Sequence, residues 1–429
     1  MTTTQPDGGV DPGVPLRLSY IIGTYPVLTE TFIDREVQHL LDLGADLEIV
    51  SIRRPRTDLS EGQQRLARRV RYLLPASAFQ LTAAHVTALA RHPRTYLGTL
   101  AWLLTRNHEG MPRRRTFLHF VTGIYAAWTL RSRRGIHVHA HFVDRAATVA
   151  LVASRFLDSS YSVTAHAREI YVDVWMLRER ISGAAFVATC TEYNRRYLAD
   201  LVGGDVATRI IRLYHGLDFD TYPDVVRQPD TDRPLILAVA QLTERKGLRH
   251  LVQACRLLAD RNRDFTCEIV GDGPLREALL TQATELGLED RVHLTGPLRY
   301  PEVVDRYRRA TAFVLPCIVA PDGDRDGIPN VILEAMAAGV PVVSTPVSGI
   351  PEVLRDGDTG IVVPEGDPAA TADAIERLLD DRDLAAGLAR RARDFVRAEF
   401  DLHRNIDRLV QRFSVLQRDA PQPNARAEP

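Results

Sequence analysis

The chain has 429 residues, of which 45% are hydrophobic and 25% charged, a balance typical of a globular protein with two or three domains. Its formal net charge of −1 excludes the global attraction to nucleic acid that a strongly basic protein would have. Its four cysteines have no paired spacing, so neither a disulfide framework nor a cysteine metal motif is predicted. With the polar start at residues 1–14, they favour a cytoplasmic protein.

Residues 16–51 predict a strand, a helix and a second strand. Apolar runs at 16–22 and 45–51 enclose a helical stretch at 30–43 that stops at Gly44. This order is typical of a Rossmann-like half, in which ligands bind beyond the carboxyl ends of the strands. We therefore expect Gly23 and Thr24, in the loop after the first strand, to face a ligand. A plain turn without a binding role is the alternative.

Residues 53–135 predict helices with arginine-rich ends. The stretches 81–104 and 113–134 have a helical pattern, and Arg113-Arg114-Arg115 opens the second. Such a surface suits docking on anionic lipid, where it would admit a lipid-linked acceptor. Helices that simply pack on the N-terminal domain are the alternative. The longest apolar run, 116–130, is shorter than the ~20 residues of a membrane span.

Three histidines alternate along a predicted strand at 135–142. His137, His139 and His141 share one face, because residues two apart on a strand point the same way. Zinc is one interpretation, but ligands in a line along one strand make a poor tetrahedral clamp, so no metal site is predicted. The next strand leads to His166, whose strand-end position favours a ligand site over a satisfied core histidine.

A polar, proline-bearing linker at 221–233 divides the chain. We predict an N-terminal domain at 15–222, a C-terminal domain at 233–400 and a last helix at 401–416, with disordered tails at 1–14 and 417–429.

The second domain begins with a strand at 235–240 and a helix at 248–260. The loop between them contains Lys246, the only lysine in the chain. A lysine in an arginine-dominated sequence suits a compact charge on phosphate, although chance survival is the alternative.

The stretch 321–352 combines an acidic loop, a helix and a buried strand. Free N–H groups at the helix start, near Ile328, attract an anion. Asp326 stands before this start and Glu334 lies eight residues further on, so both carboxylates can accept hydrogen bonds from sugar hydroxyls.

Three other interpretations of this stretch were weighed. A calcium loop opening at Asp322 is disfavoured, because its twelfth position is Leu333 where a bidentate glutamate is needed. A glycosidase carboxylate pair and a solvated acidic loop remain open from the residues alone.

The segment 322–352 resembles the signature of family 4 glycosyltransferases, and it is similar to the subgroup of colanic acid and other exopolysaccharide glycosyltransferases. Its sequence is DGDRDGIPNVILEAMAAGVPVVSTPVSGIPE. The resemblance extends to a P-x-x-[ST]-E-T-F-I segment at 26–33, the histidine strand and the turn at His166. It implies an α/β protein of the GT-B fold, with two Rossmann-like domains facing a central cleft and a last helix that crosses back to the first domain.

The resemblance also implies roles for residues. His141, Asp326 and Lys246 match positions that act in catalysis. The positions implied for substrate binding are Gly23, Thr24, His166, Gln241, Arg245, Gly271, Leu298, Gly327, Ile328, Pro329, Asn330 and Glu334. The chain departs from the family pattern twice: Asp326 replaces the first glutamate of Glu-x7-Glu, and Gln241 replaces a phosphate-binding arginine, for which the neighbouring Arg245 can compensate.

By this resemblance, the chain is expected to be a retaining glycosyltransferase of the hexosyltransferase type. It would move a sugar from a UDP- or GDP-linked donor to a saccharide or lipid-linked acceptor in exopolysaccharide biosynthesis, with no metal, cofactor or nucleic acid. The expected location is cytoplasmic, with peripheral contact to anionic membrane. The alternatives are a secondary-metabolite glycosyltransferase, a sugar-nucleotide-binding protein with little turnover, and a GT-B phosphorylase or epimerase.

Overall fold

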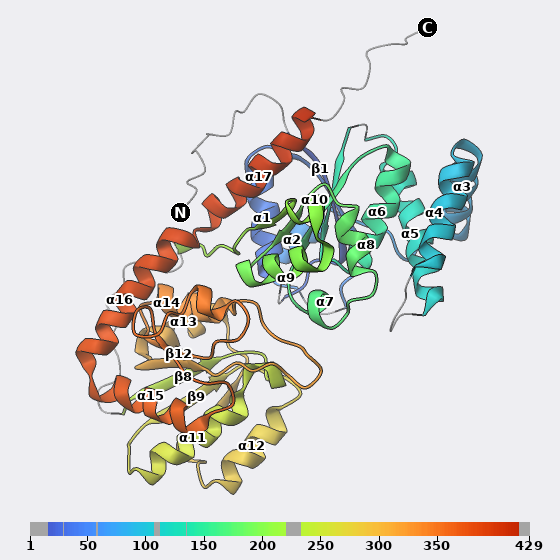
Figure 1. The fold of residues 1–429 in the computed structure, drawn as a ribbon. Coiled ribbons are helices and arrows are strands. Elements are labelled where there is room, and N and C mark those ends of the chain that lie inside the picture. The colour runs from blue at the N-terminus through green and yellow to red at the C-terminus, as the bar shows by residue number, and fades with distance from the viewer. Residues whose placement is uncertain are drawn as a thin grey trace. The chain divides into compact units, whose positions relative to one another are not determined.

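The computed structural model describes residues 16–28, 30–56, 59–106, 112–133, 135–219 and 233–419 (Figure 1). The predicted tail at 1–14, nearly all of the predicted linker at 221–233 and most of the tail at 417–429 lie outside these residues. The chain divides into two compact units. The N-terminal unit comprises Met1–Thr189, Arg195–Leu213 and His403–Pro429, and the C-terminal unit comprises Cys190–Asn194 and Tyr214–Leu402.

The N-terminal unit contains a parallel sheet of seven strands in the order β3-β2-β1-β4-β5-β6-β7. Its strands are β1 (Arg17–Thr24), β2 (Asp46–Arg53), β3 (Val70–Tyr72), β4 (His137–His141), β5 (Tyr161–Ala165), β6 (Val187–Thr189) and β7 (Ile210–Arg212). Both faces of a parallel sheet are covered by its crossover helices, which explains why β4 and β5 are buried at every residue.

The helices in this half of the chain are α1 (Thr31–Asp42), α2 (Glu61–Ala67), α3 (Ala78–Arg91), α4 (Pro93–Thr105), α5 (Arg113–Leu130), α6 (Arg145–Leu157), α7 (Arg168–Tyr171), α8 (Leu177–Ser182), α9 (Glu192–Val202) and α10 (Gly204–Ala207). Three details differ from the sequence prediction. The helix predicted at 81–104 is two helices, because Pro93 cannot continue α3 and instead begins α4. The helix predicted at 113–134 ends at Leu130. Helix α6 and the short elements α2, β3, α7, α8 and α10 were not predicted.

Helices α3, α4 and α5 lie side by side, and α5 packs on α6 (Figure 1). Gly123 makes the second contact close, since a Cβ there would lie 2.5 Å from Val152 Cβ. Helix α17 (Leu402–Asp419) belongs to this unit from His403 onward. Its Phe413 contacts the rings of Tyr20 and His139.

The C-terminal unit contains a parallel sheet of six strands in the order β10-β9-β8-β11-β12-β13. Its strands are β8 (Leu235–Val239), β9 (Thr266–Val270), β10 (Val292–Gly296), β11 (Ala312–Leu315), β12 (Val342–Ser344) and β13 (Ile361–Val362). Its helices are η2 (Glu244–Lys246), α11 (Leu248–Asp260), α12 (Arg276–Glu285), α13 (Tyr300–Arg309), α14 (Asn330–Ala337), η3 (Ile350–Glu352), α15 (Pro368–Asp380) and α16 (Arg382–Glu399).

Helix α11 shows how sequence periodicity builds this unit. Leu248, Leu251, Val252, Cys255 and Leu258 recur at the spacing of one helix face, and all five are buried. The helix predicted at 248–260 is thereby confirmed. Among the residues described, no helix has both the length and the apolarity needed to cross a bilayer.

Candidate active site

Each sheet has a point where its strand order reverses, and ligands bind at such points in open α/β sheets. In the N-terminal unit this point lies between β1 and β4, and in the C-terminal unit between β8 and β11. The loops after β8 and β11 contain Lys246 and Asp326, and His141 ends β4. Gly23 and Thr24, expected in a loop, are the last residues of β1. The two groups are described separately below.

Lys246 lies in the turn that follows β8. Gly247 ends this turn with a φ of +65°, and a Cβ there would lie 1.8 Å from Pro316 O. Only glycine fits this approach to the loop after β11. The approach brings Lys246 Nζ to 2.8 Å from Asp326 Oδ2. Lys246 is buried, with 8% of its surface exposed, so the ion pair bridges β8 and β11 in a largely dry position.

Arg245 contacts the same acidic loop. Its Nη1 donates to Asp324 Oδ2 at 2.6 Å, and its Nε lies 3.3 Å from Asp326 Oδ1. These carboxylates raise the pKa of the half-buried guanidinium, against the opposing effect of burial. Gln241 is exposed. Two cations therefore meet Asp326, and the compensation of Gln241 by Arg245 stays a prediction.

The acidic loop is organised by these cations and by its own backbone. Asp322 Oδ1 accepts from the Asp324 N–H at 3.0 Å, while Asp324 and Asp326 pair with Arg245 and Lys246. The carboxylates that a calcium loop would turn inward are thus already neutralised by side-chain cations. This arrangement agrees with the low weight given to calcium from the sequence.

Helix α14 begins directly after this loop. Pro329 occupies its N-cap position without a side-chain cap, so the first amide groups of the helix are not capped by a side chain. Gly327, Ile328 and Asn330 complete this approach to the helix. Glu334, half-buried in α14, accepts a hydrogen bond from the hydroxyl of Tyr307 at 3.2 Å, which fixes the direction of its carboxylate.

The glycine turn after β9 has a packing role. Gly271 has a φ of +132°, and a Cβ there would lie 1.9 Å from Ala240 O. The turn therefore lies against the backbone that leads from β8 toward Lys246. Leu298, in the loop after β10, packs partly buried against the core of the unit. The predicted contacts of Gly271 and Leu298 with a nucleotide remain predictions.

In the N-terminal unit, His141 ends β4 and is fully buried. Its Nε2 lies 3.0 Å from Glu36 Oε1, which also accepts from the Tyr20 hydroxyl at 2.7 Å. Its Nδ1 has no hydrogen-bond partner among the described residues. The ring of His166 stacks on that of His141 at 5.9 Å, so the sheet brings these two predicted histidines together.

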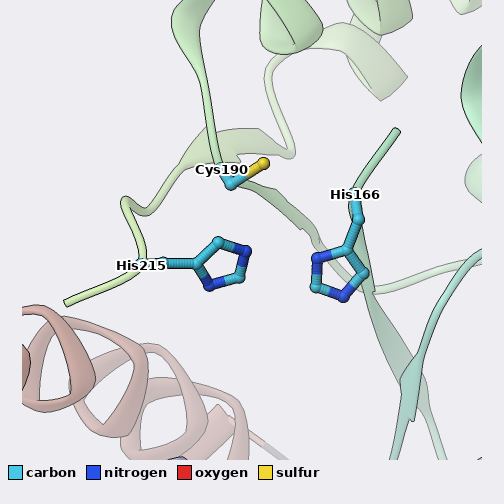
Figure 2. A group of neighbouring side chains, drawn as sticks. All are labelled: His166, Cys190 and His215. Carbon is cyan, nitrogen blue, oxygen red and sulfur yellow. The ribbon is translucent and has the colours of Figure 1, made fainter. Parts of the chain in front are cut away.

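His166 follows β5 and contacts the ring of Phe142 at 4.4 Å. Figure 2 shows it with Cys190 and His215, which follow the neighbouring strands β6 and β7. Sequence reasoning placed His166 correctly at a strand end.

The other two histidines of β4 bond to hydroxyl groups. His137 lies within 2.9 Å of both Ser160 Oγ and Ser162 Oγ, and His139 lies 2.8 Å from Ser162 Oγ and 3.0 Å from Thr164 Oγ1. Burial lowers the pKa of His137 to about 4 and that of His139 well below its usual value. Both are neutral structural groups at neutral pH.

One set of side chains in this unit has the composition of a metal site. Glu36, His139 and His141 each offer a ligand atom, and these atoms lie within 4.8 Å of one another. Both ring nitrogens of His139 and the Glu36 carboxylate already have protein partners. Hydrogen bonding therefore accounts for this cluster without an ion.

Two further residues lie near the end of β1, of which Glu30 belongs to the 26–33 segment and Arg145 was not singled out from the sequence. Glu30 precedes α1, and burial raises its pKa to about 7. Its Oε2 is buried without a hydrogen-bond partner among the described residues. Arg145 begins α6, and its Nη2 lies 3.5 Å from Thr24 Oγ1. A sequence signal exists for Glu30, in the segment at 26–33, but Arg145 has none.

Comparison with known proteins agrees with this geometry. Residues 224–395 match the family model described as glycosyl transferases group 1. The chain is also 30% identical over 320 residues to alpha-D-kanosaminyltransferase of Streptomyces kanamyceticus, covering 66% of this chain and 80% of that protein. The chain belongs to the group 1 (family 4) glycosyltransferases.

Other relatives of this glycosyltransferase match along their whole length. The amylovoran biosynthesis glycosyltransferase AmsK of Erwinia amylovora is 29% identical, with 93% of this chain and all of that protein covered. The putative colanic acid biosynthesis glycosyltransferase WcaL of Escherichia coli is 26% identical, with 92% of this chain and all of that protein covered. The subgroup expected from the 321–352 stretch is thereby confirmed.

The fold is confirmed by solved structures. HepE of Anabaena, solved in complex with UDP, superposes with a TM-score of 0.69 at 16% identity, covering 93% of this chain and all of that one. The two parallel sheets, together with the similarity to HepE, identify the GT-B fold.

Proposed function

We propose that this glycosyltransferase transfers a sugar from a nucleotide-diphosphate sugar to a hydroxyl acceptor, with retention of anomeric configuration, and that the donor binds the C-terminal unit. The observation that carries this proposal is the Lys246–Asp326 ion pair at the reversal point of the sheet. A cation beside the uncapped start of α14 suits a diphosphate. HepE, which shares the fold, was solved with UDP.

Each residue of this corner has a role in the proposal. Lys246 and Arg245 bind the diphosphate, and Glu334 accepts hydrogen bonds from the ribose. Asp326 binds the donor sugar once the diphosphate has taken over its cations. The acceptor oxygen forms a bond to the anomeric carbon as the bond from that carbon to the diphosphate oxygen breaks. The acceptor proton passes to the departing phosphate, whose growing charge the cations stabilise. No metal is part of this scheme.

We further propose a cytoplasmic, membrane-peripheral enzyme of exopolysaccharide biosynthesis with a lipid-linked acceptor. AmsK and WcaL are named for exopolysaccharide synthesis. Helices α3 to α5 expose large apolar side chains between arginines: Phe79 is 83% exposed, and Leu97 and Leu118 are each 59% exposed. This combination suits insertion among anionic lipids, which attract the arginines as the apolar groups enter.

The donor is tested by titrating the full chain with UDP, GDP and a panel of their sugars in calorimetry, and by assaying release of nucleotide diphosphate with acceptor lipids extracted from an exopolysaccharide producer. We expect one nucleotide to bind and its sugar to be transferred. Binding of none of them would contradict the proposal, and binding without turnover would favour a sugar-nucleotide-binding protein.

A small-molecule acceptor is the second candidate. It is favoured by the identity to alpha-D-kanosaminyltransferase, which exceeds the identities to AmsK and WcaL. Transfer to a soluble small-molecule acceptor, but not to a lipid-linked saccharide, would establish it.

A further inference from the structure

A cluster of positive charge surrounds the reversal point of the N-terminal sheet, and no role has been assigned to it. Arg145, the first residue of α6, lies over the end of β1. A Cβ at Gly23 would be only 2.8 Å from Arg145 Nε, so the glycine makes the space that the guanidinium occupies. Arg145 Nε is buried without a hydrogen-bond partner among the described residues.

Arg53, Arg115 and Arg180 act on the same histidine, His119, as Arg145 does. Arg53 ends β2, and Arg115 lies in the first turn of α5. Arg180 is fully buried, donates to Val143 O at 2.6 Å just before α6, and leaves its Nη2 without a partner in the described part of the chain. In those same residues, neither Arg53, Arg115 nor Arg145 forms an ion pair with a carboxylate.

His119 reports the proximity of these groups. Its ring stacks on Trp175 at 5.5 Å, and the Arg180 guanidinium lies 3.6 Å over the same indole. Burial, and after it the positive charges of Arg180, Arg145, Arg53 and Arg115, together lower the pKa of His119 to about 3. Its Nδ1 is buried and lacks a partner within the described ranges.

The carboxylates of Asp144 and Glu169 both act on Arg180. The Asp144 carboxylate accepts from the Ala146 N–H at 2.8 Å as the cap of α6. Arg145 and Arg180 both act on Asp144, and their buried Nε and Nη2 groups lack partners within the described residues. An anion that accepts from these groups would satisfy them. Guanidinium groups bind tetrahedral oxyanions through paired hydrogen bonds, so the chemistry suits a phosphate.

We propose that the N-terminal unit contains an anion site around Arg145, at the ends of β1 and β4, that binds a phosphate or diphosphate group of the acceptor. This inference rests on the proposed function, and it adds that the acceptor carries a phosphate or diphosphate group. A phosphate belonging to the nucleotide sugar is the other source of the same chemistry, and the experiment separates the two.

The test is calorimetric titration of the full chain with inorganic pyrophosphate in the presence of saturating UDP, repeated on K246A. We expect saturable binding to wild type and to K246A. In Arg145→Gln, binding weakens about ten-fold or more, because charged hydrogen bonds are lost. Gly23→Ala should do the same, because its Cβ displaces the guanidinium. Arg145→Lys should keep part of the affinity, and the exposed Arg69→Gln should keep all of it.

Unchanged pyrophosphate binding in Arg145→Gln, or none in wild type, would overturn the inference. Binding lost in K246A but kept in Arg145→Gln would assign the anion to the donor and overturn it as well. Circular dichroism and the fluorescence of Trp175 check that each variant is folded. If no nucleotide binds the protein at all, the proposed function fails, but the comparison of Arg145→Gln with K246A under pyrophosphate still decides this site.

Discussion

Lys246 Nζ and Asp326 Oδ2 lie 2.8 Å apart. The adjacent Arg245 binds Asp324, and 79 positions separate these two residues along the chain. The Lys246–Asp326 pair links the turn after β8 to the loop after β11. In this state the carboxylate satisfies the cation that the proposed reaction assigns to a diphosphate. In the proposed reaction, the donor diphosphate replaces the Asp326 carboxylate as the partner of Lys246. The lysine is therefore ion-paired both before and after the donor binds.

Lys246→Ala tests whether the lysine cation binds the diphosphate of the donor. We expect the donor kcat/KM to fall by about ten-fold or more, since a charge-assisted contact to the leaving diphosphate is removed while Arg245 remains. Steady-state kinetics with the donor identified in the binding panel measure it. Arg390→Ala, an exposed change in α16, is the control and should leave kcat/KM as in wild type. Wild-type kinetics in Lys246→Ala would remove the role assigned to this lysine.

Asp326→Asn separates the two roles of the carboxylate. Without its negative charge, Lys246 and Arg245 lose a competitor for phosphate, so the nucleoside diphosphate should bind several-fold more tightly. Sugar transfer should nevertheless fall, because the amide accepts weaker hydrogen bonds from the sugar. Calorimetry with the diphosphate and kinetics with the donor give the two values. Asp324→Asn, which frees only Arg245, should show a smaller gain in affinity. Weaker diphosphate binding in Asp326→Asn would contradict the replacement of Asp326 by the diphosphate.

Glu30 makes stability depend on pH. Burial raises the pKa of this carboxyl from 4.5 to about 7 in the folded chain. Between these values the unfolded chain releases the proton while the folded chain keeps it, so Glu30 favours the folded state at low pH and this contribution is lost as pH rises through 7.

Glu30→Gln should therefore raise the Tm by a few degrees at about pH 8 and change it little at about pH 5. Differential scanning calorimetry at both pH values measures the change. Glu61→Gln, an exposed change in the same unit, should show no such difference. A Glu30 variant less stable than wild type at high pH would mean that the ionised carboxylate is stabilised by its neighbours.

Two glycines predict opposite effects of alanine. At Gly271 the φ of +132° and the 1.9 Å approach to Ala240 O leave no space for a Cβ, so Gly271→Ala should lower the Tm by several degrees and weaken donor binding. At Gly98, in α4, nothing lies within 4 Å of a Cβ, and Gly98→Ala should stabilise the protein by about 0.5–1 kcal/mol through helix propensity. Chemical denaturation compares both with wild type. Equal effects of the two changes would show that the turn after β9 can relax.

The exposed face of α3 to α5 predicts membrane binding. Replacing Phe79 and Leu97 by serine should reduce cosedimentation with vesicles that contain phosphatidylglycerol by about ten-fold, since each buried side chain contributes about 1.5–3 kcal/mol at most. Val415→Ser, at an exposed apolar position of α17, should bind as wild type does. If the wild-type protein bound neutral phosphatidylcholine vesicles equally well, the arginines would not contribute to membrane binding.

The sequence by itself determined the alternation of strands and helices, because buried parallel strands and amphipathic helices each have a local pattern. It also determined Lys246, Asp326 and Glu334 as candidates, since a lone lysine in a loop and acids beside a helix start are local features. The break at Pro93 was readable in the same way but was missed, because the apolar pattern of α3 continues into α4.

The tertiary structure alone decided which candidates meet. The order of strands in a sheet depends on packing between distant segments, so nothing local shows that β8 lies beside β11 and β1 beside β4. That order pairs Lys246 with Asp326 and puts Arg145 over Gly23. Side-chain direction and burial are likewise non-local, which is why the burial of Glu30 and the position of Arg145 emerge only in the folded chain.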